Sequence, residues 1–282
     1  MTFRTRFAPS PTGPLHLGHA YSAWLGWTMA QQARGEFLLR IEDIDRQRSK
    51  PTWEDRIYAD LEWLGLTWAE AVLRQSSRIS AYRSALQQLW DLGVLYPCTC
   101  NRRDIQEALG APQEGSPLPV GPDGLVYPGT CRTKPRPSQM SDNSVLRLDM
   151  ARALQVCTSL AFVETGLFDQ TIRLSHDDLI NTVGDIVLAR RDMGTSYHLS
   201  VVLDDAHQNI NHVVRGADLF EATAIHVVLQ NLLILPTPIY HHHALVRDNA
   251  GKRLAKRDDA RAIATYRDQG LTAEQVIALS QP

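Results

Sequence analysis

Short apolar runs alternate with longer amphipathic segments along the first hundred residues. Residues 3–8 read as a strand, and after a turn rich in proline and glycine, apolar residues recur at helical spacing over residues 17–34. Residues 37–41 predict a second strand, and residues 51–64 and 79–92 predict two further helices. Strands that alternate with helices are typical of βαβ units, so this region predicts an α/β fold with a parallel sheet.

This rhythm breaks after residue 96. Between residues 110 and 137, twelve of 28 residues are Gly or Pro, too many for regular structure. Strand-like runs follow at residues 145–148, 160–164 and 170–174. We interpret residues 96–178 as an insertion between two halves of one catalytic domain, residues 1–95 and 179–246.

The second half repeats the alternation. The pattern predicts strands at residues 185–189, 197–203 and 239–246, and a helix at residues 219–233. The last segment, residues 247–282, combines a basic loop with a short helix that opens at Thr272, where Gln275 stands at capping-box spacing.

Composition and charge limit the class of protein. The 282 residues are 44% hydrophobic and 21% charged with a formal net charge of −2, as in an ordinary globular protein. No run reaches the ~18 apolar residues of a membrane span, and the N-terminus lacks the apolar stretch of a signal peptide. Four cysteines are too few for a disulfide scaffold. We therefore expect a cytoplasmic protein without a membrane partner. The plain expectation for its oligomeric state is a monomer. A local basic face could still bind nucleic acid.

A histidine-rich motif stands at the junction of the first predicted strand and helix. His16 and His19 flank Gly18 there. The glycine permits close approach of the backbone to a ligand, the helix end supplies N–H donors, and imidazoles can donate to phosphate oxygens. The motif therefore predicts a phosphate site, although a turn with two capping histidines would use the same residues.

A basic run lies near the other end of the chain. Lys252, Arg253, Lys256 and Arg257 place four cations within six residues. Such a run is usually a solvated surface loop, and a functional role requires an anionic partner such as a triphosphate.

Together these features resemble the class I glutamyl-tRNA synthetases. Residues 6–19, RFAPSPTGPLHLGH, resemble the opening of that family with its HIGH motif, and residues 253–257, RLAKR, resemble its KMSKS loop. Residues 40–45 (RIEDID), 201–205 (VVLDD) and 212–218 (HVVRGAD) also resemble family blocks, in the family's order. The resemblance implies a Rossmann-like class I catalytic domain with an insertion of the acceptor-binding kind.

The length of the chain indicates which members of this family it resembles most. Glutamyl-tRNA synthetases continue for about two hundred residues into an anticodon-binding domain, a whole domain by size, whereas about 25 residues follow the basic loop here. We expect no anticodon-binding domain, as in the glutamyl-queuosine tRNA(Asp) synthetases, which are stand-alone paralogues of the catalytic core. The resemblance implies L-glutamate, ATP with Mg²⁺, and tRNA(Asp) carrying queuosine at the first anticodon position as substrates.

Three cysteines and a tyrosine match a feature of those paralogues. Cys98 and Cys100 form a C-x-C pair, and Tyr127 and Cys131 form a Y-x3-C pair. By their spacing alone, three unrelated cysteines are as good an interpretation as a metal site. The resemblance implies one structural zinc site at these four residues, which would also give shape to the Gly/Pro-rich segment. Cys157 lies in an apolar run and is predicted to be a buried thiol.

Roles in the reaction follow from charge. Activation brings the carboxylate of glutamate against the α-phosphate of ATP, so the site has to neutralise negative charge. We assign catalysis to His16, His19 and Lys256, and ATP binding to these three with Gly18. Mg²⁺ comes with the triphosphate and needs no site made by protein alone.

Glutamate recognition calls for cations and one carboxylate. Arg6 and Arg215 can hold carboxylates through two hydrogen bonds each, and the resemblance places Glu42 at the α-amino group. The predicted glutamate-binding residues are Arg6, Phe7, Ala8, Pro9, Ser10, Glu42, Tyr197 and Arg215. Plainer roles exist: Arg6 could pair with Glu42 or Asp43, and Tyr197 could be a core aromatic. The tract 241–243 is predicted to be structural, with His243 near the adenine.

Two positions depart from the family pattern. Arg253 stands first in the KMSKS-like loop and Ala255 occupies a position where serine is usual, while Lys256 is kept. Three other functions remain as alternatives: a reduced glutamyl-tRNA synthetase acting on tRNA(Glu), a small-acid adenylate-forming ligase without RNA, and a non-catalytic RNA-binding descendant.

Overall fold

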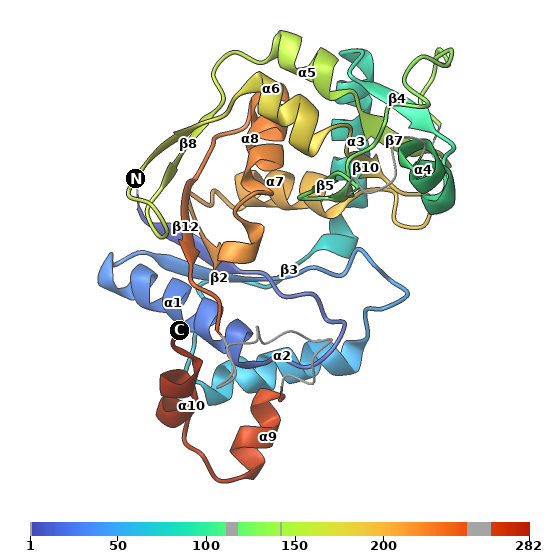
Figure 1. The fold of residues 1–282 in the computed structure, drawn as a ribbon. Coiled ribbons are helices and arrows are strands. Elements are labelled where there is room, and N and C mark those ends of the chain that lie inside the picture. The colour runs from blue at the N-terminus through green and yellow to red at the C-terminus, as the bar shows by residue number, and fades with distance from the viewer. Residues whose placement is uncertain (1, 111–117, 142, 247–260) are drawn as a thin grey trace.

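The N-terminal part forms a parallel sheet, as predicted. The computed structural model describes residues 2–110, 118–141, 143–246 and 261–282. Strands β1 (Arg4–Phe7), β2 (Glu36–Ile41) and β3 (Leu73–Arg74) pair in that order, all parallel. Helix α1 (Leu17–Gln32) links β1 to β2, and α2 (Pro51–Trp63) lies between β2 and β3 (Figure 1).

A second sheet continues this one. Its order is β11-β12-β8-β9, with β11 (His212–Gly216), β12 (Ile239–His243) and β8 (Ala161–Glu164) parallel and β9 (Gln170–Arg173) antiparallel at the edge. The backbone N–H of Asn211 donates to the carbonyl of Arg4 at 3.1 Å, so β11 lies beside β1. The 3₁₀ turn η3 (Ala217–Leu219) and helix α8 (Thr223–Leu232) link β11 to β12.

The remaining elements lie around these sheets. An antiparallel sheet has the order β10-β7-β4, and β5 and β6 form a small hairpin. These strands are β4 (Leu95–Cys98), β5 (Val120–Gly121), β6 (Gly124–Leu125), β7 (Val145–Leu148) and β10 (Val187–Ala189). The helical elements are η1 (Gln75–Arg78), α3 (Ile79–Asp91), α4 (Arg102–Leu109), α5 (Met150–Val156), α6 (His176–Asp178), the π-helical turn η2 (Leu179–Val183), α7 (Tyr197–His207), α9 (Ile263–Asp268) and α10 (Ala273–Ser280).

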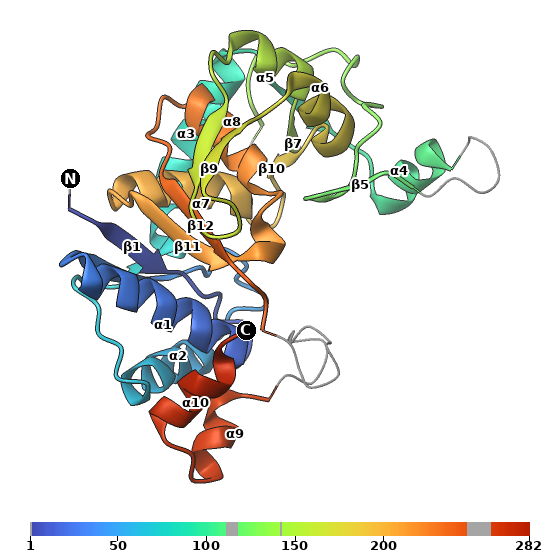
Figure 2. The same cartoon turned by 60° about the vertical axis from the view of Figure 1, so that its left-hand side comes forward.

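Both faces of the parallel sheet are buried. In β2, Phe37 and Leu39 pack into a core shared with α1, α2 and α10, whereas Leu38 points into the opposite core, shared with α3, α5, α7 and α8. Successive side chains of a strand alternate between faces, so a sheet covered on both sides needs a continuous apolar run. Figure 2 shows α1 and α10 on one side of the sheet and α7 and α8 on the other.

Strand pairing crosses the predicted boundaries between segments. β8 falls within residues 96–178, yet it pairs with β12 through Tyr240 and Glu164. β10 falls within residues 179–246, yet it pairs with β7 of the insertion. The division into residues 1–95, 96–178, 179–246 and 247–282 stays a prediction.

The strand predicted at residues 197–203 is wrong, because this segment is helix α7. The run of Val201, Val202 and Leu203 favours a strand locally. Ser196, however, caps a helix by accepting the N–H of Leu199 at its Oγ (3.4 Å), and α7 packs against α3 and α8. Tertiary packing therefore overrides the local preference.

The C-terminal cap is confirmed. Thr272 and Gln275 form a reciprocal capping box, with hydrogen bonds of 2.8 Å and 3.3 Å at the start of α10. Among the described residues, no helix has both the length and the apolar character needed to cross a membrane.

Candidate functional site

A cavity of about 240 Å³ opens at the carboxyl ends of β1, β11 and β12. Strands β1 and β11 are neighbours, but the helices that follow them, α1 and α8, lie on opposite faces of the sheet. Such a switch point leaves a crevice beyond the strand ends, where α/β proteins bind their ligands. Nine predicted site residues line the cavity: Arg6, Phe7, Ala8, His16, Gly18, His19, Glu42, Tyr197 and Arg215.

Two predicted residues lie beside this cavity, and a third is outside the described residues. Pro9 and Ser10 line an adjoining hollow of about 530 Å³ that shares Phe7, Glu42 and Tyr197 with the cavity. Lys256 lies outside the described residues, as do Arg253 and Ala255. The catalytic role of Lys256 stays a prediction.

Both motif histidines cap helix α1. The Nδ1 atom of His16 accepts the N–H of Gly18 at 3.1 Å, and the Nδ1 atom of His19 accepts the N–H of His16 at 3.2 Å. A neutral imidazole that accepts at Nδ1 carries its proton on Nε2, so each ring can act as a donor. A Cβ at position 18 would lie 3.1 Å from the His16 ring, so glycine leaves room for that ring. Capping and phosphate binding are therefore compatible.

A buried network of charges forms one end of the cavity. Arg6 pairs with Asp205 on α7, at 2.8 Å from Nε and 3.2 Å from Nη2, rather than with Glu42 or Asp43. Arg40 bridges Asp205 and Glu42 at 2.7 Å and 3.2 Å. Each group is less than a tenth exposed. The network holds Arg6 and Glu42 in place at the cavity wall.

The two carboxylates of this network differ in pKa. Burial raises the pKa of Glu42, and the cations Arg40 and Arg6 offset only part of that effect. For Asp205, burial also acts to raise the pKa, but Arg6 and Arg40 hydrogen-bond to it directly and the net pKa is lowered. Asp205 is therefore the fixed counter-charge, and Glu42 is the carboxylate available to a ligand.

Asp205 was missed as a site residue by sequence reasoning. It appeared only within the block at residues 201–205, beside Asp204. Asp204 does something different: it accepts hydrogen bonds from Gln75, Arg78 and Tyr82 and ties α7 to α3. The pair of aspartates gave no signal to tell which one faces the site.

Arg215 is held on all three guanidinium nitrogens. Nε donates to His242 Nε2 at 3.0 Å, Nη1 donates to His226 Nδ1 at 3.1 Å, and Nη2 donates to Thr223 Oγ1 at 2.7 Å and to the carbonyl of Leu219 at 3.2 Å. The group is therefore fixed and largely desolvated, with little freedom to reorient toward a ligand.

The charge of Arg215 is balanced through a neutral histidine. His242 Nδ1 donates to Glu164 Oε2 at 2.5 Å. Burial, followed by the nearby Arg215, lowers the pKa of His242 to about 4, so its ring is neutral near pH 7. Glu164 thus supports Arg215 from a distance. His242 therefore has the structural role that the sequence predicted for the whole tract 241–243.

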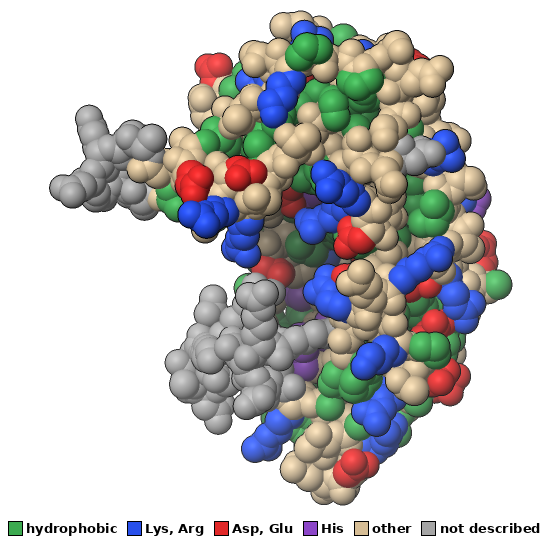
Figure 3. Space-filling view, turned by 90° about the vertical axis from the view of Figure 1, so that its right-hand side faces the viewer, with side chains coloured by type: hydrophobic (Ala, Val, Ile, Leu, Met, Phe, Trp, Pro, Cys, Tyr) green, Lys and Arg blue, Asp and Glu red, His purple; other side chains and the backbone are tan. Residues whose placement is uncertain are grey.

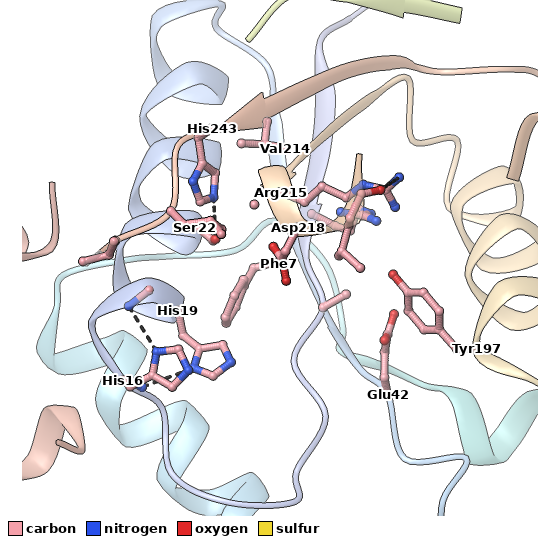
Figure 4. A pocket seen from close by; sticks show the side chains of 17 residues that line it. Phe7, His16, His19, Ser22, Glu42, Tyr197, Val214, Arg215, Asp218 and His243 are labelled. Atoms are coloured by element: carbon pink, nitrogen blue, oxygen red, sulfur yellow. Dashed lines mark hydrogen bonds between the residues drawn. The ribbon is translucent and has the colours of Figure 1, made fainter. Parts of the chain in front are cut away.

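Tyr197 begins α7 and faces the cavity. Its ring meets the His198 and His226 rings edge-on, at centroid distances of 5.3 Å and 5.8 Å. In Figure 4, Tyr197 and Glu42 lie at one end of the cavity, and His16 and His19 at the other. His243 accepts from the Ser22 hydroxyl at 2.7 Å on the wall beside α1. Its proximity to adenine stays a prediction.

The structure brings the four predicted zinc ligands together. The Sγ atoms of Cys98, Cys100 and Cys131 all lie within 4.8 Å of one another. The Tyr127 hydroxyl lies 3.3 Å from Cys100 Sγ and 3.5 Å from Cys98 Sγ. Cys157 is buried in the core between α5 and α8, away from this cluster, as predicted.

Polar neighbours favour a thiolate in this cluster. Burial acts to raise the pKa of Cys131, but hydrogen bonds from Tyr127 and Thr99 outweigh it and lower the pKa to about 5. Arg147 donates to Cys98 Sγ at 3.4 Å and stacks over the Tyr127 ring at 3.9 Å. Thiolates are the form in which cysteine binds metal.

Comparisons with known proteins show the family of this chain. The family model of the catalytic domain of class I tRNA synthetases (E and Q) matches residues 2–280. A Glutamyl-Q tRNA(Asp) synthetase from Rhodobacter capsulatus is 60% identical over 275 residues, covering 96% of this chain and 97% of that protein. The protein of the same name from Nocardia farcinica is 40% identical, over 97% of this chain and 82% of that one.

Solved structures give the same fold. The glutamate-tRNA synthetase of Elizabethkingia anophelis aligns with a TM-score of 0.72 and 27% identity over 92% of this chain. The chain spans 53% of that protein, about half its length. The Rossmann-like parallel sheet predicted from the sequence is confirmed. The chain belongs to the class I tRNA synthetases of the E and Q type, and it spans their catalytic domain.

Proposed function

We propose that this protein activates L-glutamate with ATP and transfers the glutamyl group to queuosine in tRNA(Asp). One observation carries the proposal: the guanidinium groups of Arg6 and Arg215 and the carboxylate of Glu42 line one cavity. The similarity of the chain supports the same proposal, because it is 60% identical to a Glutamyl-Q tRNA(Asp) synthetase over almost the full length of both proteins. Glutamate carries two carboxylates and one ammonium group, the complement of that charge pattern.

The amino acid binds between α7 and the ends of β1 and β11. Nη1 of Arg6 makes no hydrogen bond to a described residue, so it is available to a carboxylate of the ligand. Arg215 offers its positive charge and the remaining N–H of Nη1 to the other carboxylate. Glu42 holds the α-ammonium group, and Tyr197 closes this end of the cavity.

The triphosphate binds at the start of α1. The Nε2 donors of His16 and His19, with the helix N-terminus, face the phosphates. A carboxylate oxygen of glutamate attacks the α-phosphorus, the P–O bond to pyrophosphate breaks, and glutamyl-adenylate forms. Lys256 neutralises the leaving pyrophosphate, and Mg²⁺ arrives bound to ATP. The acceptor then attacks the acyl carbon and releases AMP.

The cysteine cluster fits a structural zinc ion. With Zn–S distances of about 2.3 Å, tetrahedral ligands lie about 3.8 Å apart. Cys100 and Cys131 are 3.5 Å apart, and Tyr127 adds an oxygen beside both. Cys98, Cys100, Tyr127 and Cys131 would hold the ion, which would tie β4 to the loop before β7.

Cys131→Ser is expected to remove the bound zinc. Metal analysis of the purified protein should give about one zinc per chain for the wild type and close to none for this variant, because three ligands hold zinc poorly. Tyr127→Phe should weaken zinc binding at least ten-fold in a chelator competition. Cys157→Ser is the matched control and should keep its zinc. Equal zinc content in Cys131→Ser and wild type would contradict the site.

Acidification is expected to weaken glutamate binding through Glu42. The pKa of this carboxyl is raised, so protonation begins above the usual range of glutamic acid as the pH falls. A protonated Glu42 no longer attracts the α-ammonium group, so the KM for glutamate should rise with falling pH. Its neighbours Arg40 and Asp205 have pKa values shifted away from this range and stay charged.

Glutamate-dependent pyrophosphate exchange between about pH 5 and pH 8 measures this effect. Glu42→Gln should show a high KM for glutamate that no longer depends on pH. A wild-type KM that stays flat over this range would contradict the assignment of Glu42 to the ammonium group.

The decisive experiment for the proposed function offers labelled glutamate and ATP to three RNAs: tRNA(Asp) with queuosine, tRNA(Asp) without it, and tRNA(Glu). Label only on queuosine-containing tRNA(Asp) is the expected result. Label on tRNA(Glu) would make the protein a reduced glutamyl-tRNA synthetase, and pyrophosphate exchange with no labelled RNA would indicate an adenylate-forming ligase. We also propose a cytoplasmic location, which a tRNA substrate and four cysteines without a disulfide support.

A further inference from the structure

A second hollow adjoins the site, and nothing in the reaction so far uses it. Its volume is about 640 Å³, and it lies between the cysteine cluster, the start of α4 and the loop after β10. Arg190 lines both this hollow and the smaller one that contains Pro9, Ser10 and Glu42. The smaller hollow thus adjoins both the reaction site and the second hollow, and Arg190 lies between the smaller hollow and the second hollow.

The second hollow presents three arginines that form no ion pair with the described residues. Arg102, Arg190 and Arg191 line it and are exposed, and none forms an ion pair with any residue that the structure describes. The surface view shows Lys and Arg side chains along the hollowed face of the molecule (Figure 3). A group of solvated arginines that faces a hollow attracts polyanions.

The acidic residues of the hollow only partly offset these arginines. Asp185 is paired with Arg132 at 2.9 Å, and Asp123 faces His198 at 3.4 Å. Asp192 is exposed and without an ion-pair partner in the described part of the chain. The three arginines therefore outnumber the unpaired carboxylates, and the hollow carries net positive charge.

The substrate of the transfer step supplies a matching polyanion. A modified nucleoside that enters the reaction site stays attached to its RNA chain, so its flanking phosphates have to pass over the rim of the site. We propose, on the basis of the proposed function, that Arg190, Arg191 and Arg102 bind successive phosphates of the RNA strand next to the acylated nucleoside. Phosphate contacts of this kind position an RNA without reading its sequence.

The size of the hollow favours a strand over a single anion. A volume of about 640 Å³ far exceeds one phosphate group, and its cations come from two separate elements, α4 and the loop after β10. The strand would run from Arg190 toward Arg102 beside the cysteine cluster. In this arrangement the cysteine cluster would fix one wall of an RNA-binding groove in place. Cys100 belongs to this cluster and lies two residues before Arg102.

The test compares neighbouring arginines of α4. Arg102 lines the hollow, whereas Arg103 is 85% exposed, does not line it and pairs with Glu107 at 2.7 Å. The variants are the double substitution Arg102→Ala with Arg191→Ala, the single Arg190→Ala, and Arg103→Ala as matched control. Each is measured for binding of queuosine-containing tRNA(Asp) and of its isolated anticodon stem–loop over a series of salt concentrations.

The double variant should bind both RNAs about ten-fold more weakly, and the slope of log Kd against log salt should fall by roughly one to two. Arg190→Ala should lower the slope by about one. Arg103→Ala should match the wild type. Glutamate-dependent pyrophosphate exchange without RNA should be unchanged in the double variant, because both arginines lie outside the reaction site.

The outcomes separate this inference from the proposed function. If the wild type labels tRNA(Asp) but the double variant keeps the wild-type affinity and salt slope, the groove is wrong and the function stands. If the wild type labels no RNA but binding still depends on these arginines, the groove stands and the function is wrong. Loss of pyrophosphate exchange in the double variant would overturn the inference, since the arginines would then serve adenylate formation.

Discussion

Arg215→Met is expected to lower kcat/KM for glutamate by about a hundred-fold to a thousand-fold, mainly through KM. In the proposed complex the buried guanidinium pairs with a carboxylate of glutamate, and truncating one partner of a buried, hydrogen-bonded charge pair costs about 2–5 kcal/mol. Because every nitrogen of Arg215 is held by protein acceptors, a lysine cannot restore the arrangement with its single ammonium group. Arg215→Lys should therefore recover only part of the loss.

Pyrophosphate exchange with varied glutamate and then varied ATP separates the two substrates. The KM for ATP should change little, since the phosphates bind at the far end of the cavity, beside His16 and His19. Arg173→Ala, on the edge strand β9, serves as control and should behave as wild type. An equal rise in both KM values would contradict a specific role in glutamate recognition.

Asp205→Ala is expected to lower the free energy of unfolding by about 3–5 kcal/mol. This carboxylate is the counter-charge for both Arg6 and Arg40, and Arg40 is fully buried. Without Asp205, two guanidinium groups would remain in the interior, and Arg40 would keep only the weaker influence of Glu42 and Asp204 among the described carboxylates that act on it. Such uncompensated buried charge is among the largest single-residue penalties in proteins.

Denaturant unfolding followed by circular dichroism measures this loss. Asp192→Ala is the matched control, because Asp192 is an exposed carboxylate without an ion-pair partner in the described chain, and should unfold like the wild type. Glu42→Gln should also change stability little, because burial already raises the pKa of that carboxyl. An Asp205→Ala midpoint equal to that of the wild type would contradict the charge network.

Most elements of the parallel sheet could be predicted from apolar periodicity. Five elements lie within two residues of their expected bounds: β1, β2, α1, α2 and α3. Each of them has the apolar pattern along the chain that its own buried surface requires. Helix α7 could not be predicted in this way, because its valine-rich stretch favours a strand and only its packing makes it a helix. α4 has no buried residue, so it left no apolar stripe to detect.

The residues of the site could be predicted from the sequence, but the hydrogen bonds and ion pairs between them could not. Arg6, Glu42 and Arg215 were expected to face glutamate directly, and they do line one cavity. Their partners are distant in the sequence: Asp205 lies 199 residues from Arg6, and His242 lies 27 residues from Arg215. Such contacts depend on which strand ends meet at the switch point, and no local pattern contains that information.

The interlocked strand pairing has a consequence for how the chain folds. β8 joins the sheet formed by β11 and β12, while β10 is a strand of the sheet formed by β4 and β7. Neither part can complete its own sheet until the other is in place, so local order in the insertion depends on long-range closure. We therefore expect the chain to gain its structure as one cooperative unit.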